Sequence, residues 1–179
     1  MRPVERALAL GIKLLVLDVD GVLTDGRLIL GRAGEEIKAF SVKDGVGIKV
    51  AQFAGIEVAF LSARSSEIVM RRAEMLGVRE VRQGKERKLP VVREMAAARG
   101  ITLDEIAYVG DDVVDLEPVA EVGLGVAVAD ACADLLAAAD RVTDAAGGCG
   151  AARETIEAIL RARGDWTDAY RGYLAAARE

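Results

Sequence analysis

The stretch that decides the fold is Asp18-Val19-Asp20-Gly21-Val22-Leu23-Thr24-Asp25-Gly26, which directly follows the apolar residues 12–17. An apolar run that ends in two carboxylates and a glycine predicts a buried strand that delivers two acids to a loop at its carboxyl end. Because Val19 separates the two acids, their side chains would share one face of a regular strand. Like charges held that close repel each other, so a divalent cation such as Mg²⁺, which prefers oxygen ligands, is expected beside them.

Length and composition bound the class of protein. The chain has 179 residues, so we expect a single domain over residues 1–179 with a sizeable core. Hydrophobic residues make up 52% of the chain and aromatic residues only 4%, so the core should consist of Val, Leu, Ile and Ala. The net charge of −5 argues against a nucleic-acid surface, although a local basic cluster could still bind a small anion.

Several types of chemistry are excluded because the chain has no histidine, which rules out His-based triads and His-ligated zinc. Cys132 and Cys149 are too few and too far apart for a zinc site, and we expect them to be reduced thiols of a cytoplasmic protein. We expect no signal peptide and no membrane span, because no uncharged apolar run approaches the roughly 20 residues that a span needs.

The rest of the chain alternates between strand and helix patterns, which predicts an α/β fold: a doubly wound, mostly parallel Rossmann-like sheet with helices on both faces. The expected strands cover residues 13–18, 57–61, 78–81, 106–109, 125–128 and, weakly, 140–142. A short amphipathic lead covers 3–10, and the expected helices cover 46–53, 66–76, 86–98, 113–120, 131–138 and 151–163. Four glycines should end helices in the left-handed conformation: Gly55, Gly77, Gly100 and Gly123.

One segment interrupts the alternation. Residues 27–30 and 37–42 flank Gly31-Arg32-Ala33-Gly34-Glu35, which predicts a β-hairpin flap over about 27–42. A protruding two-stranded ribbon exposes edge groups and is marginal alone, so we expect a homo-oligomer in which hairpins of several subunits meet. The tail, 164–179, carries the only Trp and two of the three Tyr on a predicted short helix, which indicates core packing or an interface.

A second acidic cluster follows the fourth expected strand, in Tyr108-Val109-Gly110-Asp111-Asp112 with Asp115 three residues on. Either Asp112 or Asp115 could instead cap the following helix. The carboxyl ends of parallel strands meet at one sheet edge, so the two acidic clusters should lie together around a divalent cation. Ser62 and Lys88, both near strand ends, could balance the acids and bind a phosphate, and Arg64 could contact another anionic group of a substrate.

This ordered set of motifs resembles the haloacid dehalogenase superfamily, and within it the cap-less 3-deoxy-D-manno-octulosonate 8-phosphate (KDO 8-phosphate) phosphatases. The resemblance covers nearly the whole chain. Besides the four motifs it includes the hairpin and residues 40–48, 61–65, 126–131 and 146–154. It implies a Mg²⁺-dependent phosphatase of a phosphorylated 2-keto-3-deoxy sugar acid that works through an aspartyl-phosphate, and a homotetramer.

The resemblance also implies a role for each matching residue. Asp18 would be the nucleophile, and Asp20 would contact the substrate as general acid and then general base. Mg²⁺ would be held by Asp18, Asp111 and the backbone carbonyl of Asp20. Phosphate would be held by Ser62 and Lys88, while Asp112 and Asp115 would fix Lys88 and the metal-bound waters. The remaining substrate contacts would come from Lys43, Asp44, Gly45, Arg64 and Arg72. Asp25 is either part of this site or only a turn residue.

Three positions depart from the family pattern. Ser41 and Lys43 stand where relatives usually carry His and Arg, and Cys149 stands where many carry Arg or Lys. A related nine-carbon keto-sugar acid phosphate is therefore an alternative substrate. A non-catalytic phospho-sugar-binding or oligomerisation module is a second alternative. A receiver domain is a third, but its acceptor aspartate follows the third strand, whereas Asp18 follows the first.

Overall fold

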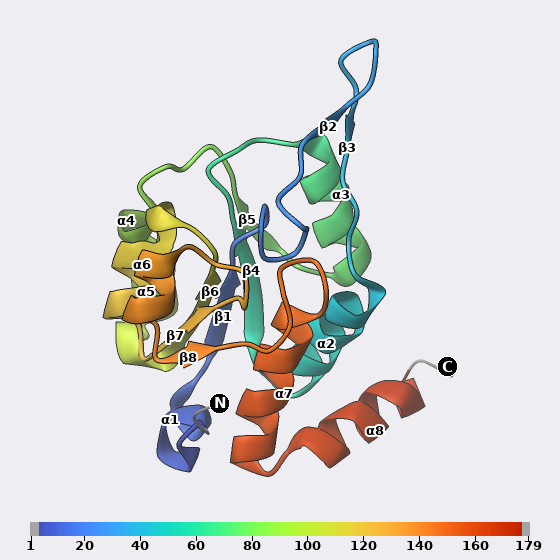
Figure 1. Cartoon of the computed structure of the whole chain (residues 1–179). Helices are drawn as coiled ribbons and strands as arrows, with labels where there is room; N and C mark the ends of the chain where they lie inside the picture. The colour runs from blue at the N-terminus through green and yellow to red at the C-terminus, as the bar shows by residue number, and fades with distance from the viewer. Residues whose placement is uncertain (1–3, 177–179) are drawn as a thin grey trace.

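A six-stranded sheet forms the centre of the protein (Figure 1). The computed structural model describes residues 4–176. The strand order is β5-β4-β1-β6-β7-β8, and every neighbouring pair is parallel. The strands are β1 (Leu14–Leu17), β4 (Glu57–Leu61), β5 (Glu80–Arg82), β6 (Ile106–Gly110), β7 (Leu124–Ala127) and β8 (Arg141–Val142). The predicted doubly wound α/β fold is confirmed.

The strand order reverses direction at β1, and this reversal creates a crevice beside β1. From β1 the chain moves outward to β4 and β5, then returns to form β6 on the other side of β1. Leu17, the last residue of β1, is therefore in register with both Phe60 of β4 and Val109 of β6. Ligands of open α/β sheets bind at such a reversal, beyond the carboxyl ends of the strands. Both acidic motifs begin at this point.

Helices cover both faces of the sheet (Figure 1). One layer contains α2 (Val42–Phe53), α3 (Glu67–Leu76) and α7 (Ala151–Arg163), and the other contains α4 (Lys88–Arg99), α5 (Leu116–Glu121) and α6 (Ala133–Ala138). The terminal helices α1 (Arg6–Gly11) and α8 (Trp166–Ala176) pack against α7 and α2. Two short 3₁₀ turns, η1 (Leu103–Glu105) and η2 (Val113–Asp115), precede β6 and α5.

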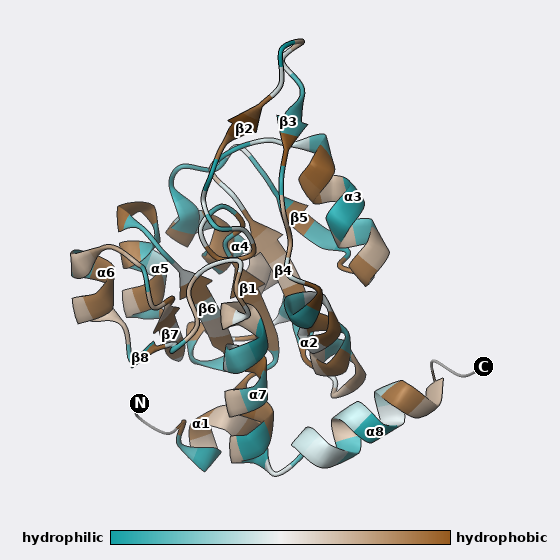
Figure 2. Ribbon diagram, turned by 45° about the vertical axis from the view of Figure 1, so that its right-hand side comes forward, coloured by the Kyte–Doolittle hydropathy of each residue, from teal (hydrophilic) through white to brown (hydrophobic). Residues whose placement is uncertain are grey.

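The core is aliphatic, as expected from the composition. The hydropathy colouring shows apolar strands at the centre and polar stretches on the helices around them (Figure 2). Phe60 and Tyr108 are among the few aromatic side chains that are fully buried there. In the tail, Trp166 is buried, and Arg153 of α7 stacks on its ring at 4.7 Å. The tail helix thus packs on the rest of the protein, which agrees with the first of the two roles expected for it, core packing.

The hairpin that follows β1 is present, but its paired part is shorter than predicted. Only β2 (Ile29–Leu30) and β3 (Glu36–Ile37) pair, in antiparallel register, and the ribbon projects beyond the sheet (Figure 1). The predicted second strand, 37–42, was too long, because Lys38 turns its side chain inward to Asp20 and residue 42 already belongs to α2.

Other element boundaries also differ from the sequence prediction. Helix α2 begins at Val42 rather than at residue 46, because Ser41 caps it by accepting a hydrogen bond from the Asp44 N–H. Strand β5 begins at Glu80 rather than at residue 78, because the Val78 N–H donates a hydrogen bond to the Ala73 carbonyl and so belongs to the end of α3. Gly55, Gly77 and Gly100 have positive φ, as predicted. Gly123 does not; it is needed because a Cβ there would lie 2.1 Å from the Asp104 carbonyl oxygen.

Two expectations concern the chain as a whole. No helix within residues 4–176 has both the length and the apolar character of a membrane span. The single-domain organisation over 1–179 stays a prediction, and its ends, 1–3 and 177–179, lie outside the described residues.

Candidate active site

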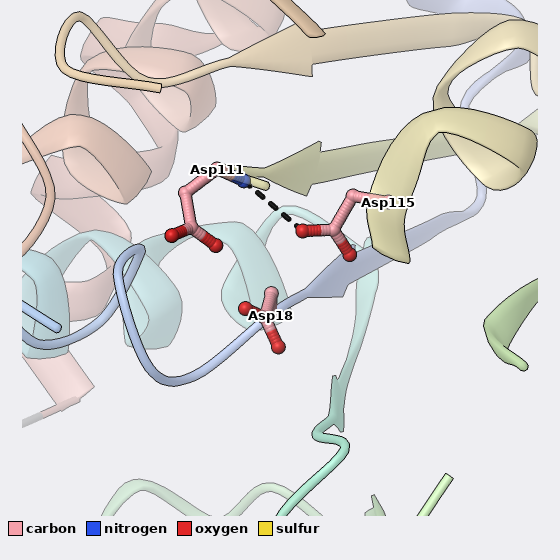
Figure 3. A group of neighbouring side chains, drawn as sticks. All are labelled: Asp18, Asp111 and Asp115. Carbon is pink, nitrogen blue, oxygen red and sulfur yellow. Dashed lines mark hydrogen bonds between the residues drawn. The ribbon is translucent and has the colours of Figure 1, made fainter. Parts of the chain in front are cut away.

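Two aspartates leave the carboxyl ends of neighbouring strands and meet in the crevice. Asp18 follows β1, and Asp111 follows β6, which pairs with β1. Together with Asp115 of η2 they offer carboxylate oxygens that all lie within 4.8 Å of one another (Figure 3). The convergence of the two acidic motifs, predicted from the parallel strand order, is therefore present.

Lys88 supplies the positive charge inside this group. It is the first residue of α4 and fully buried, and its Nζ lies 2.8 Å from Asp18 Oδ1 and 2.7 Å from Asp115 Oδ1. Burial alone would lower the pKa of Lys88, but Asp18 and Asp115 outweigh it and raise that pKa above its ordinary value. The lysine therefore stays charged. Asp18, Lys88, Asp111 and Asp115 are called the inner cluster below.

Asp115 serves to organise the inner cluster. Its Oδ1 accepts hydrogen bonds from Lys88 Nζ at 2.7 Å and Tyr108 Oη at 2.6 Å. Its Oδ2 accepts from the backbone N–H of Asp111 at 3.1 Å, drawn in Figure 3, and of Asp112 at 3.4 Å. A carboxylate has about four acceptor positions, so these four bonds leave Asp115 little capacity to bind a metal. Asp18 and Asp111 are the better candidates for ligands.

The inner cluster carries more negative than positive charge. Three carboxylates face one ammonium group, which leaves an excess of two negative charges when all are ionised. Burial raises the pKa of Asp18 to about 6, against the opposing effect of Lys88. Burial and then the charge of Asp18 raise the pKa of Asp111 to about 8. A divalent cation bound to both oxygens would remove the excess charge, so the residues present fit Mg²⁺.

The loop after β1 lies directly over Asp111. Gly21 has a φ of +103°, and a Cβ at this position would lie 2.0 Å from Asp111 Oδ2. Thr24 holds the turn closed, because its hydroxyl accepts from the N–H groups of Gly21 at 3.4 Å and Gly26 at 3.3 Å. Glycine is required at residue 21 both by the turn and by this close approach.

Asp20 points to a different set of partners from Asp18, which corrects the expectation that the two side chains share a strand face. Strand β1 ends at Leu17, so the acids lie on the following turn. Asp20 Oδ1 accepts a hydrogen bond from Lys38 Nζ at the base of the hairpin, and its Oδ2 lies 4.0 Å from Arg64 Nε. Glu36 Oε1 lies 3.3 Å from Lys38 Nζ and 3.2 Å from Arg64 Nη2, so both cations also form ion pairs with Glu36. Asp20, Glu36, Lys38 and Arg64 form the hairpin quartet.

The predicted phosphate-binding residues lie at the same edge of the sheet. Ser62 follows β4 and is buried, and its hydroxyl accepts from the Arg64 N–H at 3.1 Å. A serine hydroxyl in this position still has its own proton to donate to an anion. Together with Lys88, which lies 2.8 Å from Asp18, Ser62 provides hydrogen-bond donors beside this buried carboxylate.

The other predicted substrate residues lie near the start of α2, outside the inner cluster. Lys43 is exposed. Asp44 is buried, and its Oδ1 accepts from the Arg153 N–H at 2.7 Å, which ties α2 to α7. Arg72 of α3 donates to the Ser41 carbonyl at 3.1 Å and lies against Gly45, where a Cβ would be 2.6 Å from Arg72 Nη2.

Two further acidic residues have local contacts. Asp112 is exposed and caps η2 by accepting from the Val113 N–H at 2.8 Å, which is the capping alternative left open by the sequence. Asp25 accepts from the Arg27 N–H at 3.2 Å, which is a turn contact. Asp115, in contrast, holds Lys88 as predicted.

Three residues at this site were not predicted from the sequence. Tyr108 was read only as part of a strand, although its hydroxyl orients Asp115. Glu36 and Lys38 were read only as hairpin residues. Glu36 and Lys38 alternate with the apolar residues Ile37 and Ala39, which was the available signal, but this pattern does not indicate toward which part of the molecule the hairpin is inclined.

The fold and the site define a class of protein. Residues 77–153 match the model of the haloacid dehalogenase-like hydrolase family. More particularly, the chain belongs to the family of 3-deoxy-D-manno-octulosonate 8-phosphate phosphatases. It is 45% identical over 163 residues to the phosphatase of that name from Escherichia coli K12, a match that covers 91% of this chain and 87% of the relative.

Solved structures agree with this assignment. The phosphatase of the same name from Moraxella catarrhalis, crystallised with a magnesium ion, a phosphate ion and KDO, is 39% identical and superposes with a TM-score of 0.91 over 94% of this chain and 97% of that chain. A cobalt-bound relative from Haemophilus influenzae is 43% identical, with a TM-score of 0.88 over 93% of this chain and 99% of that chain. The predicted family membership is thus confirmed.

Proposed function

We propose that the protein is a Mg²⁺-dependent phosphatase that hydrolyses KDO 8-phosphate to KDO and inorganic phosphate. The observation that carries this proposal is the inner cluster: a buried aspartate next to a buried lysine, with an excess of negative charge that a divalent cation would balance. The family membership and the KDO complex of the Moraxella relative support the choice of substrate.

Magnesium would be held by Asp18, Asp111 and the backbone carbonyl of Asp20. When bound, it would screen the nucleophile from the phosphate and neutralise charge that develops on the phosphoryl oxygens. Because its pKa is raised to about 8, the Asp111 carboxyl releases a proton when a cation binds near neutral pH, whereas Asp18, with a pKa of about 6, does so only in more acidic solution.

Catalysis would proceed in two phosphoryl transfers. A carboxylate oxygen of Asp18 attacks phosphorus, a new P–O bond forms, and the ester P–O bond to the sugar breaks. Asp20 gives its proton to the departing sugar oxygen. It then accepts a proton from the water that attacks the aspartyl-phosphate, which frees Asp18 and inorganic phosphate.

Lys88 and Ser62 would bind the transferred group. The Lys88 ammonium has three N–H donors, and Asp18 and Asp115 account for two of them. The third is free to bind a phosphoryl oxygen, together with the Ser62 hydroxyl. Asp115 and, more weakly, Asp112 would keep Lys88 and metal-bound waters in position.

The sugar acid would contact residues nearer the protein surface. We assign this role to Asp20, Lys43, Asp44, Gly45, Arg64 and Arg72. Ser41 and Lys43 replace the usual His and Arg, so a related nine-carbon keto-sugar acid phosphate remains the alternative substrate. Ser41 caps the start of α2, so we expect that having serine instead of histidine at this position affects the orientation of the neighbouring Lys43 side chain toward a substrate.

Phosphate release from a panel of sugar-acid phosphates, with Mg²⁺ and with a chelator, tests the proposal. We expect KDO 8-phosphate to be the best substrate and the chelator to abolish turnover. Asp18→Asn should lower kcat by about 10⁴-fold or more, as removal of a nucleophile does. Asp168→Asn, which changes an exposed aspartate of α8 outside the proposed site, is the matched control. Robust activity of Asp18→Asn would refute the nucleophile assignment, and binding without turnover by the wild type would favour a non-catalytic module.

We further propose that the protein forms a homo-oligomer in which the hairpins lie at the interface between subunits. The resemblance to the family implies that this oligomer is a tetramer. Leu28, Ile29, Leu30 and Ile37 are each about half exposed or more, between 48% and 62%, on a ribbon whose edges are unpaired. Light scattering of the wild type and of Leu30→Asp tests this, with a smaller assembly expected for the variant. The cytoplasmic location stays a prediction.

A further inference from the structure

The base of the hairpin reaches into the active site through one buried lysine. The Lys38 side chain is only 1% exposed, and its Nζ donates to Asp20 Oδ1. The Asp20 side chain is 20% exposed, and its other oxygen, Oδ2, is buried and accepts no hydrogen bond from any residue in the described range 4–176. One oxygen of this carboxylate is therefore fixed by a hydrogen bond, whereas the other, 4.0 Å from Arg64 Nε, is buried without one within residues 4–176.

The lysine is itself fixed from behind. Glu36 Oε1 lies 3.3 Å from Lys38 Nζ and 3.2 Å from Arg64 Nη2, and Glu36 Oε2 accepts from the Ser66 hydroxyl at 2.7 Å. Ser66 precedes α3, so the hairpin base is anchored to the body of the protein. The hairpin quartet has two positive and two negative groups, so Lys38 needs no further anion to balance its charge.

We propose that Lys38 is a positioning residue for the proton transfers of Asp20: it clamps Oδ1 and thereby directs Oδ2 to the oxygen that leaves the substrate. This inference rests on the proposed function. A carboxyl group that rotates freely spends most of its time in orientations from which proton transfer cannot occur, and holding one oxygen removes much of that freedom. Lys38 does not contact the phosphoryl group in this arrangement; it acts through Asp20.

The proposal makes the effect of Lys38 depend on the leaving group. An alkoxide must be protonated as the ester bond breaks, whereas p-nitrophenolate leaves without help. The first turnover, measured as release of the alcohol or phenol, isolates this step from the later hydrolysis of the aspartyl-phosphate. Lys38→Met keeps the length of the side chain but removes its charge and donors.

We expect Lys38→Met to slow alcohol release from KDO 8-phosphate at least about 10-fold, and phenol release from p-nitrophenyl phosphate less than about threefold. Lys38→Gln, which retains one donor, should be intermediate. Ser66→Ala is the matched control, because it loosens the hairpin anchor but leaves the bond from Lys38 to Asp20; it should slow both substrates little and equally. In an Asp20→Asn background, Lys38→Met should add no further loss.

Equal losses on the two substrates, or an additional loss in the Asp20→Asn background, would overturn the proposal. Failure of the proposed substrate is a separate outcome. If the wild type hydrolyses p-nitrophenyl phosphate and glycerol 3-phosphate but not KDO 8-phosphate, the assignment of substrate is wrong, and the same comparison is made with glycerol 3-phosphate as the alkyl ester.

Discussion

Asp18 and Asp20 are separated by one residue, yet their carboxylates belong to two clusters with different charge balance. In the inner cluster, Asp18 shares one lysine with two other aspartates, so negative charge is in excess. In the hairpin quartet, Asp20 and Glu36 meet Lys38 and Arg64, and the charges cancel. An unbalanced cluster is suited to bind a cation, whereas a balanced one is suited to hold a carboxyl group in place without a metal.

The largest expected effect is a loss of activity, without a loss of Mg²⁺ binding, when Asp20 of the hairpin quartet is changed. Asp20→Asn should lower kcat on KDO 8-phosphate by about 10³-fold, because the general acid and base catalysis that we propose for Asp20 would both be lost. Its backbone carbonyl is retained, so the Mg²⁺ affinity measured by calorimetry should change less than about threefold, or 0.7 kcal/mol. A loss of Mg²⁺ binding comparable to the loss of kcat would show that the two clusters are not independent.

The second test removes charge from the inner cluster. Asp111→Asn should weaken Mg²⁺ binding about 100-fold, since a charged oxygen ligand is replaced by a neutral one. Without metal, the same variant should melt about 3 °C higher than the wild type near pH 8, because a buried repulsion has been relieved. Calorimetric titration and thermal melts measure the two effects, with Asp168→Asn on α8 as the control. A lower melting temperature for metal-free Asp111→Asn would contradict the excess of negative charge.

The third test uses pH. Asp18 and Asp111 have folded pKa values of about 6 and about 8, raised from 3.8, so the folded protein holds protons that the unfolded chain has lost. Stability contributed by these protons is present at low pH and is lost as pH rises through the folded pKa values. Between pH 5.5 and 8 the metal-free melting temperature should therefore fall, by about 5 °C.

Saturating Mg²⁺ should flatten this pH dependence, because the cation binds the deprotonated carboxylates. Calorimetric melts at several pH values, with chelator and with Mg²⁺, provide the comparison, and Asp111→Asn should show a shallower metal-free slope. A metal-free melting temperature that rises over this range would be incompatible with the raised pKa values.

The smallest effect is expected in the hairpin quartet. Arg64 is half exposed, so Arg64→Met should change the free energy of unfolding by less than about 1 kcal/mol, as is usual for ion pairs open to solvent. Mg²⁺ affinity should not change. Urea denaturation and calorimetry check both, and a loss above about 2 kcal/mol would mean that the quartet behaves as a buried network.

The inner cluster could be predicted from the sequence because it depends on simple rules. Asp18 and Asp111 each follow an apolar strand, and parallel strands deliver their carboxyl ends to one edge. The hairpin quartet could not be predicted, because the contacts of Lys38 with Asp20 and of Glu36 with Arg64 depend on the direction in which the hairpin is inclined. That direction depends on tertiary contacts such as the bond from Ser66 to Glu36.

The wrong predictions for the strand face of the two acids and for the start of α2 also arise from tertiary structure. The two acids were expected on one strand face, but the turn at Gly21 begins directly after β1 and separates them. The start of α2 was placed too late because Gly45 and Gly47 disfavour helix in isolation. Here a Cβ at residue 47 would lie 3.1 Å from Arg153 Cα, so the close packing of α2 on α7 favours glycine and compensates for its poor helix propensity.

The pairing of β1 with β6 has a consequence for how the molecule acquires its metal site during synthesis. The two proposed ligand side chains come from strands that are distant in sequence, so no short fragment contains both. A nascent chain that has folded β1, β4 and β5 still lacks Asp111, and the divalent ion gains its second carboxylate only when the chain returns beside β1. Tight uptake of the ion should therefore report the formation of β6 beside β1 rather than the earlier pairing of β1, β4 and β5.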